Sequence, residues 1–235
     1  MELERILHRS GFGTRRACRA LIRHGRVTVN GEACDNPFAD VDTADLVFTV
    51  DGQPWPYRET ATLMLHKPAG YECSRKPQHH PSILTLLPAP LRERDVQPIG
   101  RLDEETTGLL LITDDGKLNH ALSSPKRKVA KVYLATTRYP VDAAQIETLL
   151  AGVVLHDDPQ PVRAAAAEVT ADGRLRLTIT EGKYHQVKRM VAAAGNRVEA
   201  LHRVALGDLT LPADLQPGAW RWLDAADLAK LGCPS

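Results

Sequence analysis

Five short segments after residue 61 have the apolar or β-branched character of β-strands, and they restrict the possible folds more than any other feature. They cover residues 62–66, 109–113, 132–136, 175–180 and 198–204. Apolar residues at helical spacing mark four further segments, at 116–123, 141–151, 184–194 and 224–231. Strands that outnumber helices and follow no regular alternation are typical of an α+β domain. We therefore expect a mixed, mainly antiparallel sheet and not a doubly wound α/β fold.

Residues 51–61 contain two prolines and a glycine and show no periodicity, which is typical of a linker. We expect a small N-terminal α/β domain over residues 1–56, a linker that continues to about residue 61, and a larger domain over residues 57–235. Hydrophobic residues make up 43% of the 235-residue chain. That fraction is sufficient for a small core and a larger one.

Charge is distributed unevenly along the chain, although its formal total is only +1. Between Arg5 and Gly31 there are seven arginines and no acidic residue. A helix over residues 15–23 is expected there, with Thr14 as its N-cap, followed by a strand at 27–29 and a turn at Asn30. An ordinary solvated helix usually mixes charges of both signs. The acid-free stretch therefore favours a surface that binds nucleic-acid phosphates.

Several classes of protein are not supported by the sequence. No apolar run is long enough to span a bilayer, and the first five residues do not resemble a signal peptide. The four cysteines are scattered, without the spacing of a metal site, and there is no phosphate-binding loop or dinucleotide fingerprint. We expect a cytoplasmic protein with reduced thiols and without a cofactor or metal.

The segment from Gly100 to Gly116 is a polar loop, bracketed by glycines, that leads directly into a strongly apolar strand. Asp103 lies within it, where a short loop could hold a carboxylate rigidly over a cleft. It is followed by Glu104 and Glu105, and like charges repel each other, so an ionised carboxylate here requires a nearby cation. From its spacing alone, Asp103 would be interpreted as a capping or turn residue.

The pattern Gly-Arg-Leu-Asp-x-x-Thr-x-Gly-Leu-Leu-Leu-Ile-Thr-x-Asp-Gly over residues 100–116 resembles the catalytic motif of RNA pseudouridine synthases, in the RsuA family that modifies ribosomal RNA. Other motifs of that family follow in the same order along the chain. They are His-Lys-Pro-x-Gly-Tyr at 66–71, Lys-Val-Tyr-Leu at 131–134, the segment at 181–190 and Leu-His-Arg at 201–203. Residues 5–31 separately resemble an S4 RNA-binding domain. Together the resemblances cover nearly the whole chain.

The resemblance implies a catalytic role for three residues. Asp103 would be the nucleophile that adds to the target nucleoside, at the ribose or at the uracil ring. Tyr133 would stack on the flipped uracil and relay a proton, and Lys188 would be the counter-ion of Asp103. Without the motifs, Tyr133 would be interpreted as a buried strand residue and Lys188 as a solvent-facing cation.

The remaining expected site residues bind substrate or RNA. Arg101 is expected to contact phosphate or brace the loop, Leu201 to pack beside the pocket, and Arg189 to be a weaker candidate for phosphate. The other residues expected to bind the RNA are Arg15, Arg16, Arg19, Lys126 and Lys131.

Within the family, the third motif, His80-Pro81 and residues 193–196 point to the members that isomerise a uridine of 16S ribosomal RNA. The implied partner is that RNA, free or in an assembling small-subunit particle, bound by a monomer without a membrane. Two alternatives stay open: a synthase for 23S ribosomal RNA or transfer RNA, and an inactive RNA-binding assembly factor. The sequence departs from many relatives at Asp114, where asparagine is frequent, and at Glu72, where an apolar residue is common.

Overall fold

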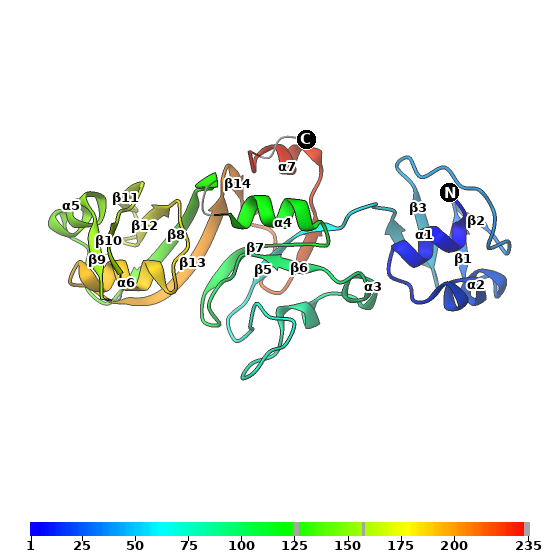
Figure 1. Ribbon diagram of the computed structural model, residues 1–235, viewed down its shortest axis with the longest axis horizontal. Coiled ribbons are helices and arrows are strands. Elements are labelled where there is room, and N and C mark those ends of the chain that lie inside the picture. Colours follow the sequence, from blue (N-terminus) through cyan, green and yellow to red (C-terminus); the bar gives the residue numbers. More distant parts are fainter. Residues whose placement is uncertain (125–126, 157, 233–235) are drawn as a thin grey trace. The chain divides into compact units, whose positions relative to one another are not determined.

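The computed structural model describes residues 1–124, 127–156 and 158–232, and the chain divides into two compact units (Figure 1). The first unit comprises Met1–Ala61 together with Leu87–Gln97, and the second comprises Thr62–Leu86 together with Pro98–Ser235. The expected domain boundary after residue 56 stays a prediction. Contacts assign residues 57–61, and also the later segment Leu87–Gln97, to the first unit.

The first unit contains three short helices and a four-stranded antiparallel sheet of order β2-β1-β3-β4. Its elements are α1 (Leu3–Arg9), α2 (Arg15–Arg23), β1 (Val27–Val29), β2 (Glu32–Ala33), β3 (Val47–Val50), β4 (Gln53–Pro56) and α3 (Ala89–Glu93). Helix α2 has its expected bounds because the Thr14 hydroxyl accepts a hydrogen bond from the backbone N–H of Ala17. The hairpin between β1 and β2 turns at Asn30, whose φ is +52°.

The core of the first unit is formed by the apolar side of α1 and α2 against the sheet. Ile6 and Ile22 are fully buried, and so is Phe48 of β3. The Phe12 ring meets both Phe48 and Trp55 edge to face, with centroids 5.7 and 5.4 Å apart. Burial of this side leaves the polar side chains of α2 at the surface.

The interpretation of residues 51–61 as a linker was wrong for its first half. Residues 53–56 form β4, which pairs with β3 in regular antiparallel register from Val50–Gln53 to Val47–Pro56. Two prolines fit there because β4 is an edge strand, where a missing N–H leaves no partner unsatisfied. The tight turn that joins β3 to β4 contains Asp51 and Gly52, both with positive φ.

The second unit is built on a nine-stranded sheet of order β11-β12-β8-β13-β7-β5-β15, in which β14 pairs with β13 and β6 with β7. The strands are β5 (Thr62–Lys67), β6 (Gln97–Ile99), β7 (Thr107–Thr113), β8 (Lys131–Thr137), β11 (Ala166–Val169), β12 (Leu175–Ile179), β13 (Val198–Leu206), β14 (Leu209–Thr210) and β15 (Trp220–Trp222). Strands β9 (Val153–Leu155) and β10 (Asp158–Val162) form a separate antiparallel pair. Strands β13 and β7 run parallel, whereas the other pairs with a defined register are antiparallel. The expected α+β fold with a mainly antiparallel mixed sheet is confirmed.

Among the described residues, the helical segments that accompany this sheet are η1 (Ile83–Leu86), α4 (Gly116–Ser123), α5 (Ala143–Ala151), α6 (Gln186–Ala193) and α7 (Ala225–Ala229). Three helices begin later than the apolar spacing predicts, for local reasons. Asp142 and Asp224 are N-caps with complete capping boxes, so α5 and α7 start directly after them. His185 has a left-handed backbone, with φ of +47°, so α6 starts at Gln186.

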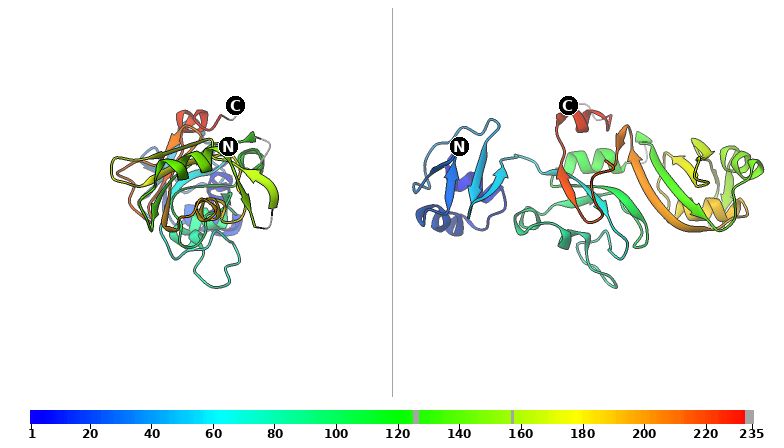
Figure 2. Two further views of the ribbon diagram at one scale, coloured as in Figure 1. Left: turned by 90° about the vertical axis from the view of Figure 1, so that its left-hand side faces the viewer. Right: turned by 180° about the vertical axis from the view of Figure 1, so that it is seen from behind.

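Strands β8 and β13 are neighbours in the middle of the large sheet. They pair over almost their whole length, and the right-hand panel of Figure 2 shows them side by side as they extend toward α5 and α6. In that pairing Arg203 lies directly opposite Tyr133, and Leu201 opposite Ala135. Side chains of directly opposite residues emerge on the same face of a sheet.

No helix among the described residues is long and apolar enough to cross a membrane.

Candidate active site

The loop that carries Asp103 is held from below by a buried lysine. Lys67, at the end of β5, is completely buried, and its ammonium donates hydrogen bonds to the backbone oxygens of Pro68, Glu104 and Thr106 at 3.0, 2.8 and 2.9 Å. Burial lowers the pKa of Lys67. Three carbonyl dipoles compensate the charge, so the lysine of the His-Lys-Pro motif braces the loop that carries Asp103. Sequence reasoning had left this residue without a role.

Further backbone contacts fix the same loop. The N–H of Gly70 donates to the oxygen of Glu104 at 3.1 Å, and the N–H of Thr106 donates to the oxygen of Asp103 at 3.1 Å. The glycine that follows, Gly108, has φ of +106°, and a Cβ there would lie 2.2 Å from the backbone oxygen of Arg203. A side chain at this position is therefore excluded by the close parallel approach of β7 to β13.

Asp103 and Lys188 both reach one cavity, but each has another ionic partner. The Asp103 carboxylate lies 3.3 Å from Nε2 of His185, whereas the ammonium of Lys188 lies 2.9 Å from the Glu105 carboxylate. Glu105 follows Asp103 by two residues, and its side chain is exposed. Its hydrogen bond with Lys188 lowers the pKa of Glu105. The structure thus adds His185, which the third motif contains but to which no role was assigned.

The cavity has a volume of about 500 Å³, which is in the range of small-molecule sites. Its walls come from five segments that are distant in the sequence: residues 99–106 before β7, the end of α4, β8, the segment from the end of β12 into α6, and β13. Six of the expected site residues line it, namely Arg101, Asp103, Lys131, Tyr133, Lys188 and Leu201. All of them belong to the second unit, so the cavity is complete within that unit.

Cations outnumber acids around the cavity. The lining includes the cations Arg101, Lys131, Lys183, Lys188 and Arg203, and the acids Asp103 and Glu181. Burial, followed by the charge of Arg203, lowers the pKa of Lys131, whose ammonium donates to the oxygen of Val129 at 3.1 Å. This positive excess favours a ligand that carries phosphates or several acceptor oxygens.

Aromatic side chains lie both deep in the cavity and at its margin. The Tyr133 side chain on β8 is 7% exposed, and Leu201 on β13 is equally buried. Tyr184 is by contrast 73% exposed and stacks on His185, with ring centroids 3.8 Å apart. The expected stacking residue, Tyr133, therefore faces the cavity. The spacing did not single out Tyr184, because an isolated tyrosine in a polar loop gives no signal.

Arg189 does not belong to this set. Arg189 is not among the lining residues, and its guanidinium donates to the backbone oxygen of Tyr184 at 3.0 Å. Lys126 lies outside the described residues. Its neighbour Arg127 lines a second hollow, beside α4, together with Lys117 and His120.

Three of the seven N-terminal arginines are paired with acids that lie outside the acid-free stretch. Their partners are Glu4 for Arg19, Glu59 for Arg9 and Asp51 for Arg26. Arg19 also lies over the Phe38 ring, 5.2 Å from its centroid.

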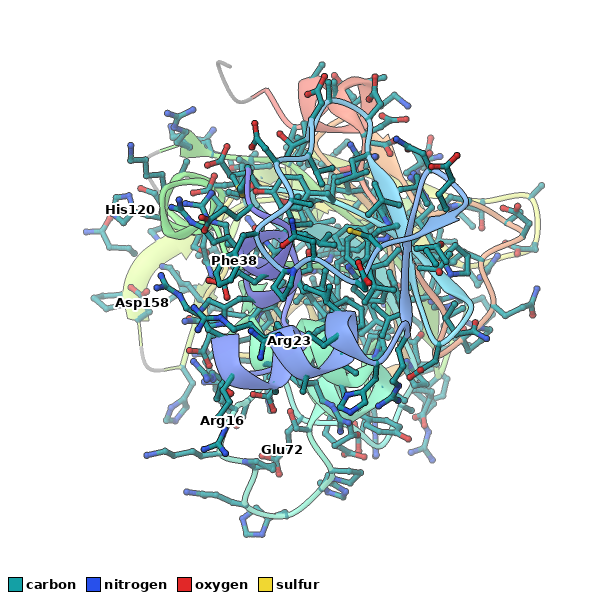
Figure 3. The ribbon with its side chains drawn as sticks, turned by 90° about the vertical axis from the view of Figure 1, so that its right-hand side faces the viewer. Arg16, Arg23, Phe38, Glu72, His120 and Asp158 are labelled. Carbon is teal, nitrogen blue, oxygen red and sulfur yellow. The ribbon has the colours of Figure 1, made fainter. Side chains whose placement is uncertain are left out.

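Four other arginines, Arg5, Arg15, Arg16 and Arg23, are exposed and have no ion pair within the described ranges. Figure 3 shows Arg16 and Arg23 on α2. Linear sequence could not separate the two groups, because the acids that neutralise Arg9 and Arg26 come from distant turns and strands.

Comparison with known proteins agrees with this geometry. The family profile described as "RNA pseudouridylate synthase" matches residues 61–193, and the profile of the S4 domain matches residues 1–47. A curated relative from Yersinia pestis named "Ribosomal small subunit pseudouridine synthase A" is 39% identical, over 100% of this chain and 99% of its own. The protein of the same name from Escherichia coli (strain K12) is 42% identical, over 89% of this chain and 90% of its own.

A solved structure has the same architecture. It is described as "Crystal structure of pseudouridylate synthase" and is 34% identical to this chain, with a TM-score of 0.70. The match covers 98% of this chain and 99% of the other. The similarity therefore extends over both units.

Proposed function

Because the chain belongs to the RNA pseudouridylate synthase family and carries an S4 domain, we propose that it isomerises a uridine of 16S ribosomal RNA to pseudouridine, with Asp103 as the nucleophile. The names of relatives 39% and 42% identical to the chain support the small-subunit RNA as the target. Within that RNA we propose the uridine at position 516. The observation that carries the proposal is the cavity that joins Asp103 to Tyr133, Lys188 and Leu201.

The reaction breaks the bond between N1 of the uracil and C1′ of the ribose, and it forms a bond between C5 and C1′. C5 loses its proton and N1 gains one, so no atom and no electron is exchanged with a co-reactant. A nucleophile and groups that move a proton are sufficient for such an isomerisation. Asp103 supplies the nucleophile in this proposal, and the phenol of Tyr133 supplies a weak acid or base.

An ionised carboxylate in a partly closed cavity needs compensating positive charge. His185 lies in contact with Asp103, and Lys188 and Arg101 line the same cavity. We assign Lys188 to the stabilisation of Asp103 when the nucleoside is bound, with Glu105 holding its ammonium at the cavity before that. Arg101 precedes Asp103 by two residues and is assigned to the phosphate of the flipped nucleotide.

The target base must leave its stack in folded RNA, which costs about a few kcal/mol. The buried ring of Tyr133 offers the base a new stacking partner, and Leu201 packs beside it. The cost is further offset by contacts with the RNA backbone. The positively charged surfaces of both units would make these contacts.

Two basic surfaces are available for the backbone contacts. Residues 116–141 form a second stretch without an acidic residue, and it includes Lys131, Lys126 and the hollow lined by Lys117 and Arg127. In the first unit, Arg15 and Arg16 are exposed on α2, whereas Arg19 is held by Glu4 and is expected to contribute less. Arg189 is assigned to the RNA strand that leaves the cavity past Tyr184.

The partner in this proposal is 16S ribosomal RNA, either free or in an assembling small-subunit particle in the cytoplasm. The protein acts as a monomer, because every residue assigned to the chemistry comes from one unit of one chain. Sedimentation of the protein with and without the RNA tests that stoichiometry.

The test of the proposal is a map of pseudouridine in all ribosomal and transfer RNAs, in cells with and without the gene. We expect one site in 16S ribosomal RNA to be lost, and to return with the wild-type gene but not with the Asp103→Asn gene. A lost site in 23S ribosomal RNA or in a transfer RNA would replace the proposed target. An unchanged map with impaired ribosome assembly would favour the inactive assembly factor.

A further inference from the structure

Two buried polar atoms at the cavity have no hydrogen-bond partner within the described residues. They are Nη2 of Arg203 and the hydroxyl of Thr106, which belong to side chains with 2% and 1% exposure. Both residues line the cavity that contains Asp103. An unsatisfied buried polar group is destabilising, and a charged one more so, and native proteins rarely retain such groups without a reason. Their coincidence at one cavity points to a ligand that completes them.

The guanidinium of Arg203 is held in a fixed orientation. Its Nε donates to the backbone oxygen of Leu109 on the adjacent strand β7 at 2.8 Å. In the described part of the chain it forms no ion pair, and the cation of Lys131 lies close enough for its pKa to be lowered by Arg203. Arg203 therefore presents a buried positive charge and an unused donor, and no carboxylate neutralises it.

The position of Arg203 relative to Tyr133 defines what it can reach. The two residues are directly opposite each other on β13 and β8, and side chains so paired are neighbours on one face of the sheet. A base stacked on the Tyr133 ring would have its edge near the guanidinium. Thr106 directly precedes β7. The next two residues, Thr107 and Gly108, pair with His202 and Arg203 of β13.

We propose that Arg203, together with Thr106, recognises the imide edge of the flipped uracil and selects uridine against cytidine. The inference rests on the proposed function, because it concerns the base on which Asp103 acts. Uracil presents an acceptor, a donor and an acceptor in the order O4, N3–H, O2. The guanidinium can only donate, and so it fits a carbonyl oxygen, whereas the threonine hydroxyl can accept from N3–H.

Cytosine is rejected by the same arrangement. It places an amino group at C4 and an acceptor at N3, so an arginine that faces C4 would meet a second donor. A site built to hydrogen-bond a specific polar group discriminates strongly, because the wrong base leaves buried groups unpaired. Arg203 thus has a use for its buried charge that is independent of phosphate binding.

The test replaces single oxygens of the substrate base with sulfur, which is a weaker acceptor. Full-length protein is assayed on 16S ribosomal RNA assembled by ligation. The three RNAs differ only at the target position, which carries uridine, 2-thiouridine or 4-thiouridine. Release of tritium from C5 gives kcat/KM for each RNA. The variants are Arg203→Gln, Arg203→Lys and Thr106→Val, and His202→Asn is the control on the same strand, outside the cavity lining.

We expect the 4-thio substitution to lower kcat/KM of the wild-type enzyme about tenfold or more, as for a lost hydrogen bond to a charged donor. The ratio of kcat/KM for the uridine RNA to kcat/KM for the thio RNA should be unchanged in the control variant. In Arg203→Gln this ratio should fall toward one. Arg203→Lys keeps the positive charge but loses the planar guanidinium with its several N–H donors, and should give an intermediate ratio. An effect of the 2-thio substitution alone would overturn the selection against cytidine, because cytosine carries the same O2.

The wild-type measurement decides the inference even where a variant fails to fold. Equal kcat/KM for all three RNAs would overturn the inference and leave the proposed function intact. A sulfur effect that persists in folded Arg203→Gln would also overturn it, because another group must then contact that atom. Absence of tritium release from the uridine RNA would overturn the proposed function and the inference together.

Discussion

In the first unit Arg15 and Arg16 stand exposed on α2 without an ion pair among the described residues, whereas in the second unit Lys67 is buried under the loop of Asp103 and Arg203 is buried in the cavity wall. The exposed cations remain hydrated, and their attraction for phosphate is screened by salt. The buried cations are dehydrated and held by backbone oxygens. We infer that charge in the first unit acts by how much of it remains unpaired, and that charge in the second unit acts by its position.

The substitution expected to have the largest effect lies at the cavity. Asp103→Asn keeps the size of the side chain but removes the anionic nucleophile, so tritium release from C5 of the target uridine should fall below detection. Affinity for the RNA should persist, because the basic surfaces are unchanged. The matched control is Asp172→Asn, an exposed acid of the same unit that pairs with Arg174. Multiple turnover by Asp103→Asn would show that another residue is the nucleophile.

The brace beneath the loop comes next. Lys67→Met fills the same space but leaves three carbonyl oxygens without their donor, and we expect the free energy of unfolding to fall by roughly 2–4 kcal/mol. Denaturant titration measures this loss. Arg9→Met removes an exposed cation paired with Glu59 and should change stability by less than about 1 kcal/mol. Comparable losses in the two variants would refute the distinction between the two kinds of cation.

Lys188 and its present partner can be separated by a pair of substitutions. If Lys188 supports Asp103 during the reaction, Lys188→Met should lower the single-turnover rate by roughly 10–100-fold, as expected when a hydrogen bond to a charged group is removed. Glu105→Gln should change that rate by no more than about threefold, because its exposed ion pair is weak. Equal losses in both would indicate that the pair with Glu105 itself is what matters. A normal rate in Lys188→Met would move the supporting role to His185.

The arginine surface should have a smaller effect, and only on binding. Arg15→Ser with Arg16→Ser should weaken RNA affinity and reduce the slope of log affinity against log salt, by about 0.7 for each phosphate of single-stranded RNA that the variant no longer neutralises. The double variant Arg9→Ser with Arg26→Ser changes net charge equally, but both of these arginines are already paired with acids. Its slope should change less. Identical slopes would mean that total charge, not unpaired charge, determines binding.

The smallest effect is expected at Glu72. Its carboxylate lies at the base of the loop at 74–81 (Figure 3) and accepts hydrogen bonds from the backbone N–H groups of Gln78, His79 and His80 at 3.1, 2.7 and 2.9 Å. These bonds lower the pKa of Glu72 from an ordinary 4.5 to about 2. A depressed pKa stabilises the loop above about pH 4.5, and that contribution is lost as the pH falls from there toward 2.

Hydrogen exchange of the amides at 78–80 tests this arrangement. Glu72→Gln should raise their exchange rates at neutral pH, and the wild-type protein should lose protection of the same amides in acid. Turnover should change little, because the loop makes no assigned contact with the base. Unaltered protection in Glu72→Gln would show that the loop is held by other contacts.

Strands and helices were predictable where short-range rules act alone. Helix α4 has the expected bounds because Asp115 caps it, and α2 begins after Thr14 for the same reason. β4 was missed because two prolines indicate a linker in a sequence, and only the pairing with β3 makes it an edge strand. The small strands β14 and β15 gave no signal, since two or three residues carry no period.

The sequence by itself determined the family, the chemistry-bearing motifs and the α+β class, because each of these is written in contiguous residues. Tertiary structure decided which charges are paired and which remain available to a ligand. Glu4, Asp51 and Glu59 neutralise three of the N-terminal arginines, and Glu105 holds Lys188 while His185 contacts Asp103. It also placed Arg203 beside Tyr133 with a donor unused. Charge pairing and burial depend on distances between residues remote in the chain, and no local pattern encodes those distances.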